Sequence, residues 1–159
     1  MAGSVGVGLA KGAGDAPAVR RASLVTIATS VAVIMCFAIP IALFPEHIAG
    51  LYLNTTDPDN ALVVALVAGF LPLASGFMFF DAVQVAAGQV VRGLKDVRWP
   101  MIYTGISFWV IGFPTAAYLS QKTDVGADGV WYGLMVGLIS ASIFLSARLW
   151  YLAWYKAKA

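Results

Sequence analysis

Charged residues are scarce in this chain. Asp, Glu, Lys and Arg make up 11% of its 159 residues, whereas 60% are hydrophobic. Soluble domains carry about 25% charged residues, so this composition excludes an ordinary soluble globular domain. The formal net charge of +2 is small and its basic residues are scattered, which excludes an extended nucleic-acid-binding surface and leaves nucleic acid out of the expected partners.

Cysteine and histidine occur once each. A single cysteine cannot form an internal disulfide, and Cys36 lies in an apolar run where a small packing residue is expected. His47 has only Glu46 beside it as a second potential ligand, which excludes a zinc site of the usual spacing. No cofactor is therefore expected.

Long apolar runs are abundant, and four of them reach the roughly 20 residues that cross a bilayer. They predict an all-α integral membrane protein in which residues 1–22 precede the first span and residues 23–159 contain the spans. The predicted transmembrane helices are about Ser23–Phe44, Ala61–Val91, Trp99–Ser120 and Gly129–Ala147.

The basic residues of the connections alternate along the chain and predict its orientation. Three precede the first span (Lys11, Arg20 and Arg21), and none lies between the first and second spans. Three lie between the second and third spans (Arg92, Lys95 and Arg98), one lies between the third and fourth (Lys122), and three follow the fourth (Arg148, Lys156 and Lys158). Because basic residues gather in cytoplasmic loops, both termini are expected in the cytoplasm.

Asp81 interrupts the second apolar run. It lies eleven residues before Arg92, the expected cytoplasmic boundary, or about 16 Å along a helix. Half of a bilayer core is about 15 Å, so Asp81 is predicted near the midplane, where a carboxylate costs about 2.5–3.5 kcal/mol. Such a residue is either functional or a protonated acid that hydrogen-bonds a neighbouring helix, and the sequence favours function.

Helical spacing puts Asp81 on one face with Phe77, Met78, Gln84 and Gly88. An anion beside an amide and soft apolar groups suits an organic cation, and the carboxylate equally suits a sodium ion or a proton. Phe77 and Met78 are possible substrate-facing residues, although packing is the simpler interpretation of both.

An enzyme is not expected, because no second acid or histidine and no serine–histidine set lies at midplane depth. A helical scaffold or channel subunit without coupled transport remains the alternative, since the fourth span carries small residues at four-residue spacing that let helices approach closely. This stripe, which we interpret as a packing face, consists of Gly129, Gly133, Gly137 and Ala141.

Two predicted cytoplasmic loops share a phrase, basic-Gly-x-x-Asp. It reads KGAGD at residues 11–15 and RGLKD at residues 92–96. The cation complements a helix C-terminus, the glycine (Gly12 or Gly93) can supply a left-handed C-cap, and the aspartate (Asp15 or Asp96) can cap the next helix. The phrase therefore predicts structural loop motifs and hints at an internal repeat.

Several segments resemble the multidrug and toxic compound extrusion (MATE) family, particularly its NorM-like branch. They are GLAKGAGDAPAVRRAS, LFPEHIAGLYLNTTDPD and FFDAVQVAAGQVVRGLKDVRWPMIYTGISFWVIGFPTAAYL. The resemblance covers nearly the whole chain, in order, and corresponds to the tail of helix eight and helices nine to twelve. Residues 1–22 are therefore expected to be a cytoplasmic loop with the tail of a preceding helix. The resemblance implies that the chain is a C-terminal fragment forming part of one six-helix lobe of a twelve-helix transporter.

The resemblance also implies a function. Members of the NorM-like branch are antiporters of the bacterial inner membrane that export cationic amphipathic compounds in exchange for sodium ions or protons. Asp81 falls on the acidic helix-ten position of the NorM-like branch, which implies cation binding or coupling, with Asp81 as a sodium ligand; Gln84 is a weaker candidate. The lipid bilayer, cationic organic substrates and a missing N-terminal lobe are the implied partners, and the fragment is expected to be inactive alone.

Overall fold

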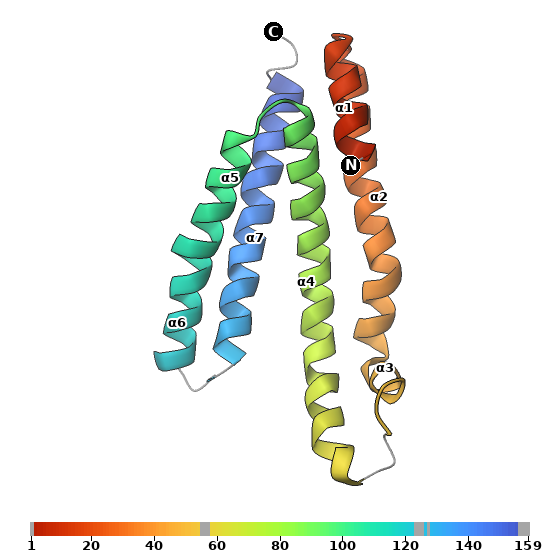
Figure 1. Cartoon of the computed structure of the whole chain (residues 1–159), viewed down its shortest axis with the longest axis vertical. Coiled ribbons are helices and arrows are strands. Elements are labelled where there is room, and N and C mark those ends of the chain that lie inside the picture. The colour runs from red at the N-terminus through yellow and green to blue at the C-terminus, as the bar shows by residue number, and fades with distance from the viewer. Residues whose placement is uncertain (1, 55–57, 123–125, 127, 156–159) are drawn as a thin grey trace. The chain divides into compact units, whose positions relative to one another are not determined.

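The described part of the chain, residues 2–54, 58–122, 126 and 128–155 of a computed structural model, is helical and contains no strand (Figure 1). The α-helices and the shorter 3₁₀ and π segments follow one another as α1 Ala2–Gly12, α2 Ala16–Leu43, α3 Pro45–Gly50, η1 Pro58–Asn60, α4 Ala61–Gly93, α5 Arg98–Gly105, η2 Ile106–Gly112, α6 Phe113–Lys122, α7 Asp128–Trp150 and η3 Tyr151–Tyr155.

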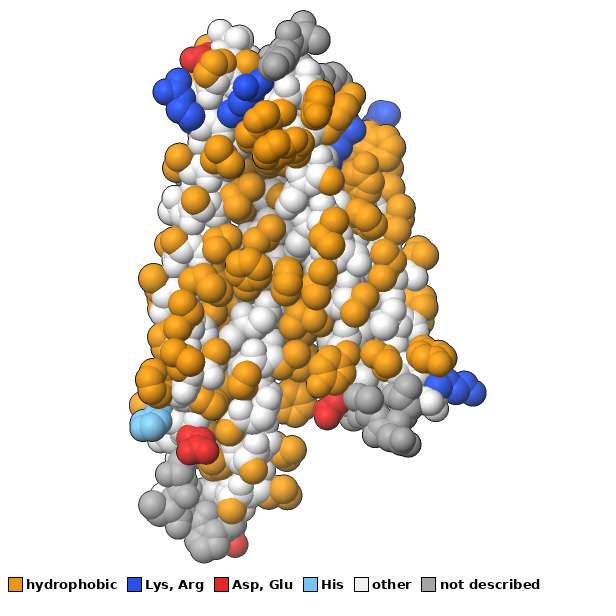
Figure 2. All heavy atoms as spheres, turned by 180° about the vertical axis from the view of Figure 1, so that it is seen from behind, with side chains coloured by type: hydrophobic (Ala, Val, Ile, Leu, Met, Phe, Trp, Pro, Cys, Tyr) orange, Lys and Arg blue, Asp and Glu red, His pale blue; other side chains and the backbone are white. Residues whose placement is uncertain are grey.

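Four continuous helical stretches are long and apolar enough to cross a membrane, as the sequence predicts. They are Ala16–Leu43, Ala61–Gly93, Arg98–Lys122 and Asp128–Tyr155. Many of their large apolar side chains, such as Phe37, Leu66 and Trp109, are exposed. Figure 2 shows hydrophobic side chains along the helices and charged side chains mainly toward their ends. This distribution suits a lipid environment, where apolar surface needs no protein cover.

The fold divides into two compact units. One consists of residues 1–30 with residues 80–159, and the other is the continuous segment Val31–Phe79. The second unit comprises the end of α2, the short helices α3 and η1, and the first part of α4, and it contains Pro40 inside α2 and Pro72 inside α4. Each proline lacks the backbone N–H that its helix needs for one hydrogen bond.

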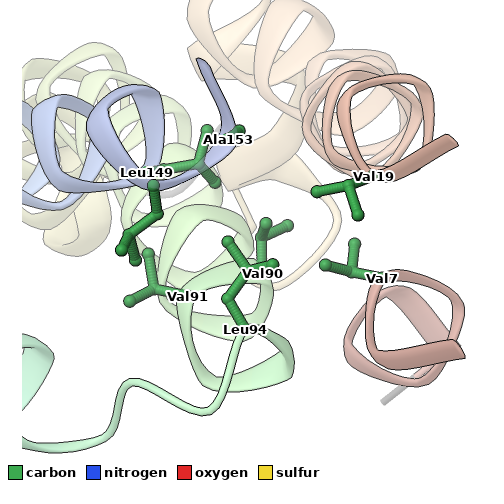
Figure 3. Packing of buried hydrophobic residues seen from close by; sticks show 8 residues of the cluster. Val7, Val19, Val90, Val91, Leu94, Leu149 and Ala153 are labelled. Carbon is green, nitrogen blue, oxygen red and sulfur yellow. The ribbon is translucent and has the colours of Figure 1, made fainter. Parts of the chain in front are cut away.

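The larger unit is held at one end by a cluster of buried aliphatic residues, here the valine–leucine cluster (Figure 3). Its side chains come from α1, α2, the end of α4 and the end of α7 with η3, and point toward one another. Val90, Val91 and Ala153 are completely buried. The cluster joins segments far apart in sequence, and its members are Val7, Val19, Val90, Val91, Leu94, Leu149, Leu152 and Ala153.

The glycine stripe of α7 is a packing face, as predicted. Gly129, Gly133 and Gly137 are buried, and Ala141 is completely buried. A Cβ atom at Gly129 would lie 2.6 Å from the backbone nitrogen of Ser120, and one at Gly133 would overlap the backbone of Ala116. Helices α6 and α7 therefore touch through their backbones, an approach that only small residues allow.

The third span is interrupted by the π-helical segment η2, which ends immediately before α6 and its Pro114. Phe113 donates its N–H to the carbonyl of Phe108, five residues back, as in a π-helix. Proline at position 114 removes one α-helical hydrogen bond, and the wider turn beside it accommodates that loss. Within η2, Ser107 is completely buried, and its hydroxyl has no partner among the described residues.

Candidate functional site

Asp81 lies in α4, one residue after a hydrogen bond that attaches this helix to α7. The hydroxyl of Ser142 donates to the carbonyl oxygens of Phe80 at 2.8 Å and of Leu138 at 2.9 Å. Ser142 is buried, so this bond lies inside the helix–helix contact. Because the contact with Phe80 holds α4 at residue 80, it also restrains the backbone from which Asp81 projects.

The carboxylate of Asp81 is exposed on the surface of its unit. It forms no hydrogen bond or ion pair with any residue that the structure describes. Nor do the described residues contain a group of three or more His, Cys, Asp and Glu side chains that could hold a metal ion. Within the described part of the chain, the Asp81 carboxylate is therefore exposed and unpaired.

Gln84 and Gly88, predicted on the same face as Asp81, line a cavity of about 390 Å³ between α4, α5 and α7. The side-chain oxygen of Gln84 is buried and has no hydrogen-bond partner among the described residues. Asp81 is not part of this lining. The predicted face is therefore divided, with the amide turned into a cavity and the acid on the outer surface of the unit.

Phe77 and Met78 belong to the other compact unit, Val31–Phe79. Both side chains are half-buried, and Phe77 interacts with another residue of the chain. They are linked to Asp81 through the continuous helix α4, and their substrate-facing role stays a prediction.

The two loops with the repeated phrase have the same backbone structure. In the first, Asp15 N–H bonds the carbonyl of Ala10 and Gly14 N–H bonds that of Lys11, both at 3.1 Å. In the second, Asp96 N–H bonds the carbonyl of Val91 at 3.2 Å and Lys95 N–H bonds that of Arg92 at 2.9 Å. Each pair is a Schellman motif, so the phrase marks a repeated helix ending.

The predicted role of the phrase glycines is wrong. The left-handed residues are Gly14 and Lys95, with φ of 70° and 61°, and not Gly12 and Gly93, which lie within α1 and α4. Gly93 has another reason to be glycine, since a Cβ atom there would lie 2.6 Å from the carbonyl oxygen of Ser4 in α1.

The phrase aspartates play different roles. Asp15 caps α2, because its Oδ1 accepts a hydrogen bond from Ala18 N–H at 2.8 Å, as predicted for a capping residue. Asp96 does not cap α5; its Oδ2 accepts from both Nε and Nη2 of Arg148, at 2.9 Å and 2.7 Å. The Arg148 guanidinium also lies over the rings of Trp99 and Tyr151, at 5.1 Å and 5.5 Å.

Sequence reasoning missed Ser142 and the pairing of Arg148. The signal for Ser142 was a hydroxyl beside the glycine stripe of an apolar helix, where an interhelical hydrogen bond is favoured. For the pairing of Arg148 with Asp96, the sequence offers only an aspartate and an arginine, each at the end of a predicted span. Both contacts join residues more than fifty positions apart.

Comparison with known proteins decides the family. A family model described as MatE matches residues 1–118, about three quarters of the chain. The chain belongs to the MatE family.

Curated relatives of this MatE chain carry the name NorM. It is 39% identical over 148 residues to Multidrug resistance protein NorM of Burkholderia vietnamiensis, an alignment that covers 93% of this chain and 32% of the relative. A probable multidrug resistance protein NorM of Deinococcus radiodurans is 37% identical, with 92% of this chain and 33% of the relative covered. The chain thus spans about a third of the length of these relatives.

The fold agrees with that of a solved MATE protein. The crystal structure of the eukaryotic MATE transporter AtDTX14 superimposes with a TM-score of 0.72 over 99% of this chain and 35% of its own chain, at 24% sequence identity. The predicted resemblance to the MATE family and its NorM-like branch is confirmed, and the MatE chain is a multi-pass membrane protein.

Proposed function

We propose that this chain is part of a membrane antiporter that exports cationic amphipathic compounds in exchange for sodium ions or protons. Asp81 is the carboxylate that holds the cation. One observation carries the proposal. The acidic side chain of Asp81 lies about 16 Å from the Arg92 end of an apolar helix, and no described residue forms an ion pair or a hydrogen bond with it.

A carboxylate at this depth needs a partner. Placing a charged carboxylate in hydrocarbon costs about 2.5–3.5 kcal/mol even on the insertion scales, which give the lowest values. An arrangement that left it in lipid would therefore be unstable. A bound cation or proton compensates its charge when it is loaded. The adjacent Ser142–Phe80 hydrogen bond supports a binding role, because a fixed backbone reduces the freedom that binding must remove.

Exchange follows from competition for this carboxylate. Occupancy by the coupling ion lowers its affinity for the organic cation, and the converse holds by linkage. A conformational cycle is driven only by interactions whose strength differs between its states. The interaction of a bound cation with a carboxylate at the midplane is of this kind. Gln84 is a second, weaker candidate for contact with the cation.

The partner of this function is the remainder of the transporter. Curated relatives are about three times as long as this chain, and we infer that the missing part forms the opposing wall of the binding site, in the manner of transporters built from repeats. We place the protein in a bacterial inner membrane with both termini in the cytoplasm, on the alternation of basic loops.

The test joins this chain to the part of the Burkholderia vietnamiensis relative that it lacks, and measures ethidium efflux under an imposed sodium or proton gradient. The chain with Asp81 should export the dye. Asp81→Asn keeps the shape and removes the charge, so the protein should fold but lose coupled efflux. Asp81→Glu should retain part of it. This chain alone should export nothing, because one wall is absent.

The matched control is Glu46→Gln, which neutralises an exposed acid in α3, outside the spans. It should leave efflux per membrane-inserted protein unchanged. Near-normal coupled efflux with asparagine at position 81 would make the residue a protonated structural acid and contradict the proposal.

A further inference from the structure

The cavity beside Gln84 combines a positive charge with an apolar wall, and cation transport does not explain this combination. It lies between the end of α4, the beginning of α5 and Leu145 of α7, with a volume of about 390 Å³. From Gln84 to Arg92 it extends about 12 Å along α4. It therefore runs from the charged end of the helix into its apolar length.

Two polar groups of this cavity lack partners within the described part of the chain. The Arg92 guanidinium folds back along its own helix, where its Nη1 would lie 3.5 Å from a Cβ atom at Gly88, and it forms no ion pair there. The buried Oε1 atom of Gln84 accepts no hydrogen bond. The unpaired guanidinium at one end of the cavity points to a ligand with an anionic group.

The charge around the cavity mouth is uncompensated. The end of α4, the connection and the start of α5 carry three cations, Arg92, Lys95 and Arg98, of which Arg92 lines the cavity, and one acid, Asp96. The carboxylate of Asp96 is already held by Arg148 at 2.7 Å. The positive charge at the mouth therefore repels an organic cation and attracts an anion.

Apart from Thr104, the rest of the lining is apolar. Val85, Val97 and Met101 form much of the wall, and Val85 and Met101 are themselves exposed on helices that lie in the membrane. A soluble anion would satisfy Arg92 but leave this wall uncovered. A molecule with an anionic head and a hydrocarbon chain satisfies both, and a bilayer supplies it as phospholipid.

We propose that the cavity between α4, α5 and α7 binds one anionic phospholipid, with the lipid phosphate on Arg92 and the start of an acyl chain against Val85 and Met101. The inference does not depend on the proposed transport function, since it concerns a cavity that excludes Asp81.

The experiment measures lipid retention by native mass spectrometry on the purified whole chain. The probes are palmitoyl-oleoyl phosphatidylglycerol and phosphatidylcholine, which share their acyl chains and differ in net charge. The chain should retain one phosphatidylglycerol in preference to phosphatidylcholine. Arg92→Gln should lower that retention about fivefold, the effect of one interfacial cation. Arg92→Lys keeps the charge and should retain most of it.

The matched control is Arg21→Gln, which removes an exposed cation from α2, outside the cavity, and should not change retention. Gly88→Leu fills the cavity and should abolish retention while Arg92 is still present. Equal retention of both lipids, or unchanged retention in Arg92→Gln, would overturn the proposal. Displacement of the lipid by excess glycerol 3-phosphate would do the same, because the site would then hold a free anion.

Discussion

Gly93 and Gly12 offer a comparison in which local backbone structure is the same and tertiary contact differs. Both precede the left-handed residue of a Schellman motif by two positions, and neither has a positive φ. A Cβ atom at Gly12 would meet nothing within 4 Å, whereas one at Gly93 would lie 2.6 Å from the carbonyl oxygen and 3.1 Å from the Cα of Ser4. Alanine should therefore have opposite effects at the two sites.

The magnitude follows from these distances. An ordinary carbon–oxygen contact is about 3.3–3.6 Å, so alanine at position 93 must push α1 away by roughly 0.7–1 Å. Overpacking of this kind costs about 1–3 kcal/mol, and backbone atoms cannot rotate aside as a flexible side chain can. Against this, replacing a helical glycine by alanine gains about 0.5–1 kcal/mol. Gly12→Ala receives the gain alone and should stabilise the chain, while Gly93→Ala should destabilise it.

The assay is unfolding of the chain in dodecyl maltoside by increasing fractions of dodecyl sulfate, followed by circular dichroism and tryptophan fluorescence. The two variants should differ by about 1–3 kcal/mol, with wild type between them. Hydrogen exchange adds a local readout, because amides of α1 should exchange faster in Gly93→Ala only. Equal midpoints for the two variants, with equal exchange in α1, would refute the backbone contact between α1 and α4.

Two further predictions concern the loops. Lys95 holds φ at 61°, a conformation that costs a non-glycine residue about 1–2 kcal/mol, so Lys95→Gly should raise the unfolding midpoint, whereas an unchanged or lower midpoint would contradict the left-handed assignment. For topology, after Cys36 is replaced by serine, cysteines at Tyr52 and Gln121 should react with an impermeant maleimide from outside the cell and one at Lys95 only after permeabilisation; external labelling at position 95 would exclude both termini from the cytoplasm.

The helical fold could be predicted because its signals are local. Four apolar runs of sufficient length, separated by short polar connections, are visible in the sequence, and helices α2, α4 and α7 follow them closely. The packing face of α7 was equally visible, since glycine at Gly129, Gly133 and Gly137 falls on one side of a helix. Lipid imposes these patterns, because every backbone group must be satisfied within the helix itself.

The details of the loops could not be predicted in the same way. The repeated phrase identified both helix ends, but a glycine at its second position suggested the left-handed residue two positions too early. Nothing local distinguishes Lys95 as a left-handed residue, since lysine is not preferred there. The pairing of Asp96 with Arg148 and of Ser142 with Phe80 depends on how distant helices pack, which hydropathy does not encode.

The candidate site is only partly visible from the sequence for the same reason. Helical spacing put Asp81 and Gln84 on one face, and the structure divides them because α5 and α7 cover the Gln84 side. Midplane depth depends on position along one helix and is readable from the sequence. Which neighbours a side chain meets depends on other helices and is not.

Helix α4 is attached to α7 at two levels, and this has a consequence for Asp81. At one level Ser142 bonds the carbonyl of Phe80, and at the other Asp96, just beyond the end of α4, pairs with Arg148. Ser142 and Arg148 are six residues apart on α7, about 9 Å along its axis. The part of α4 from Phe80 to Gly93 cannot tilt away from α7 without breaking one contact or the other. In the proposed transport cycle, any displacement of Asp81 should therefore carry α7 with it, and the movement must be taken up where these helices meet the rest of the protein.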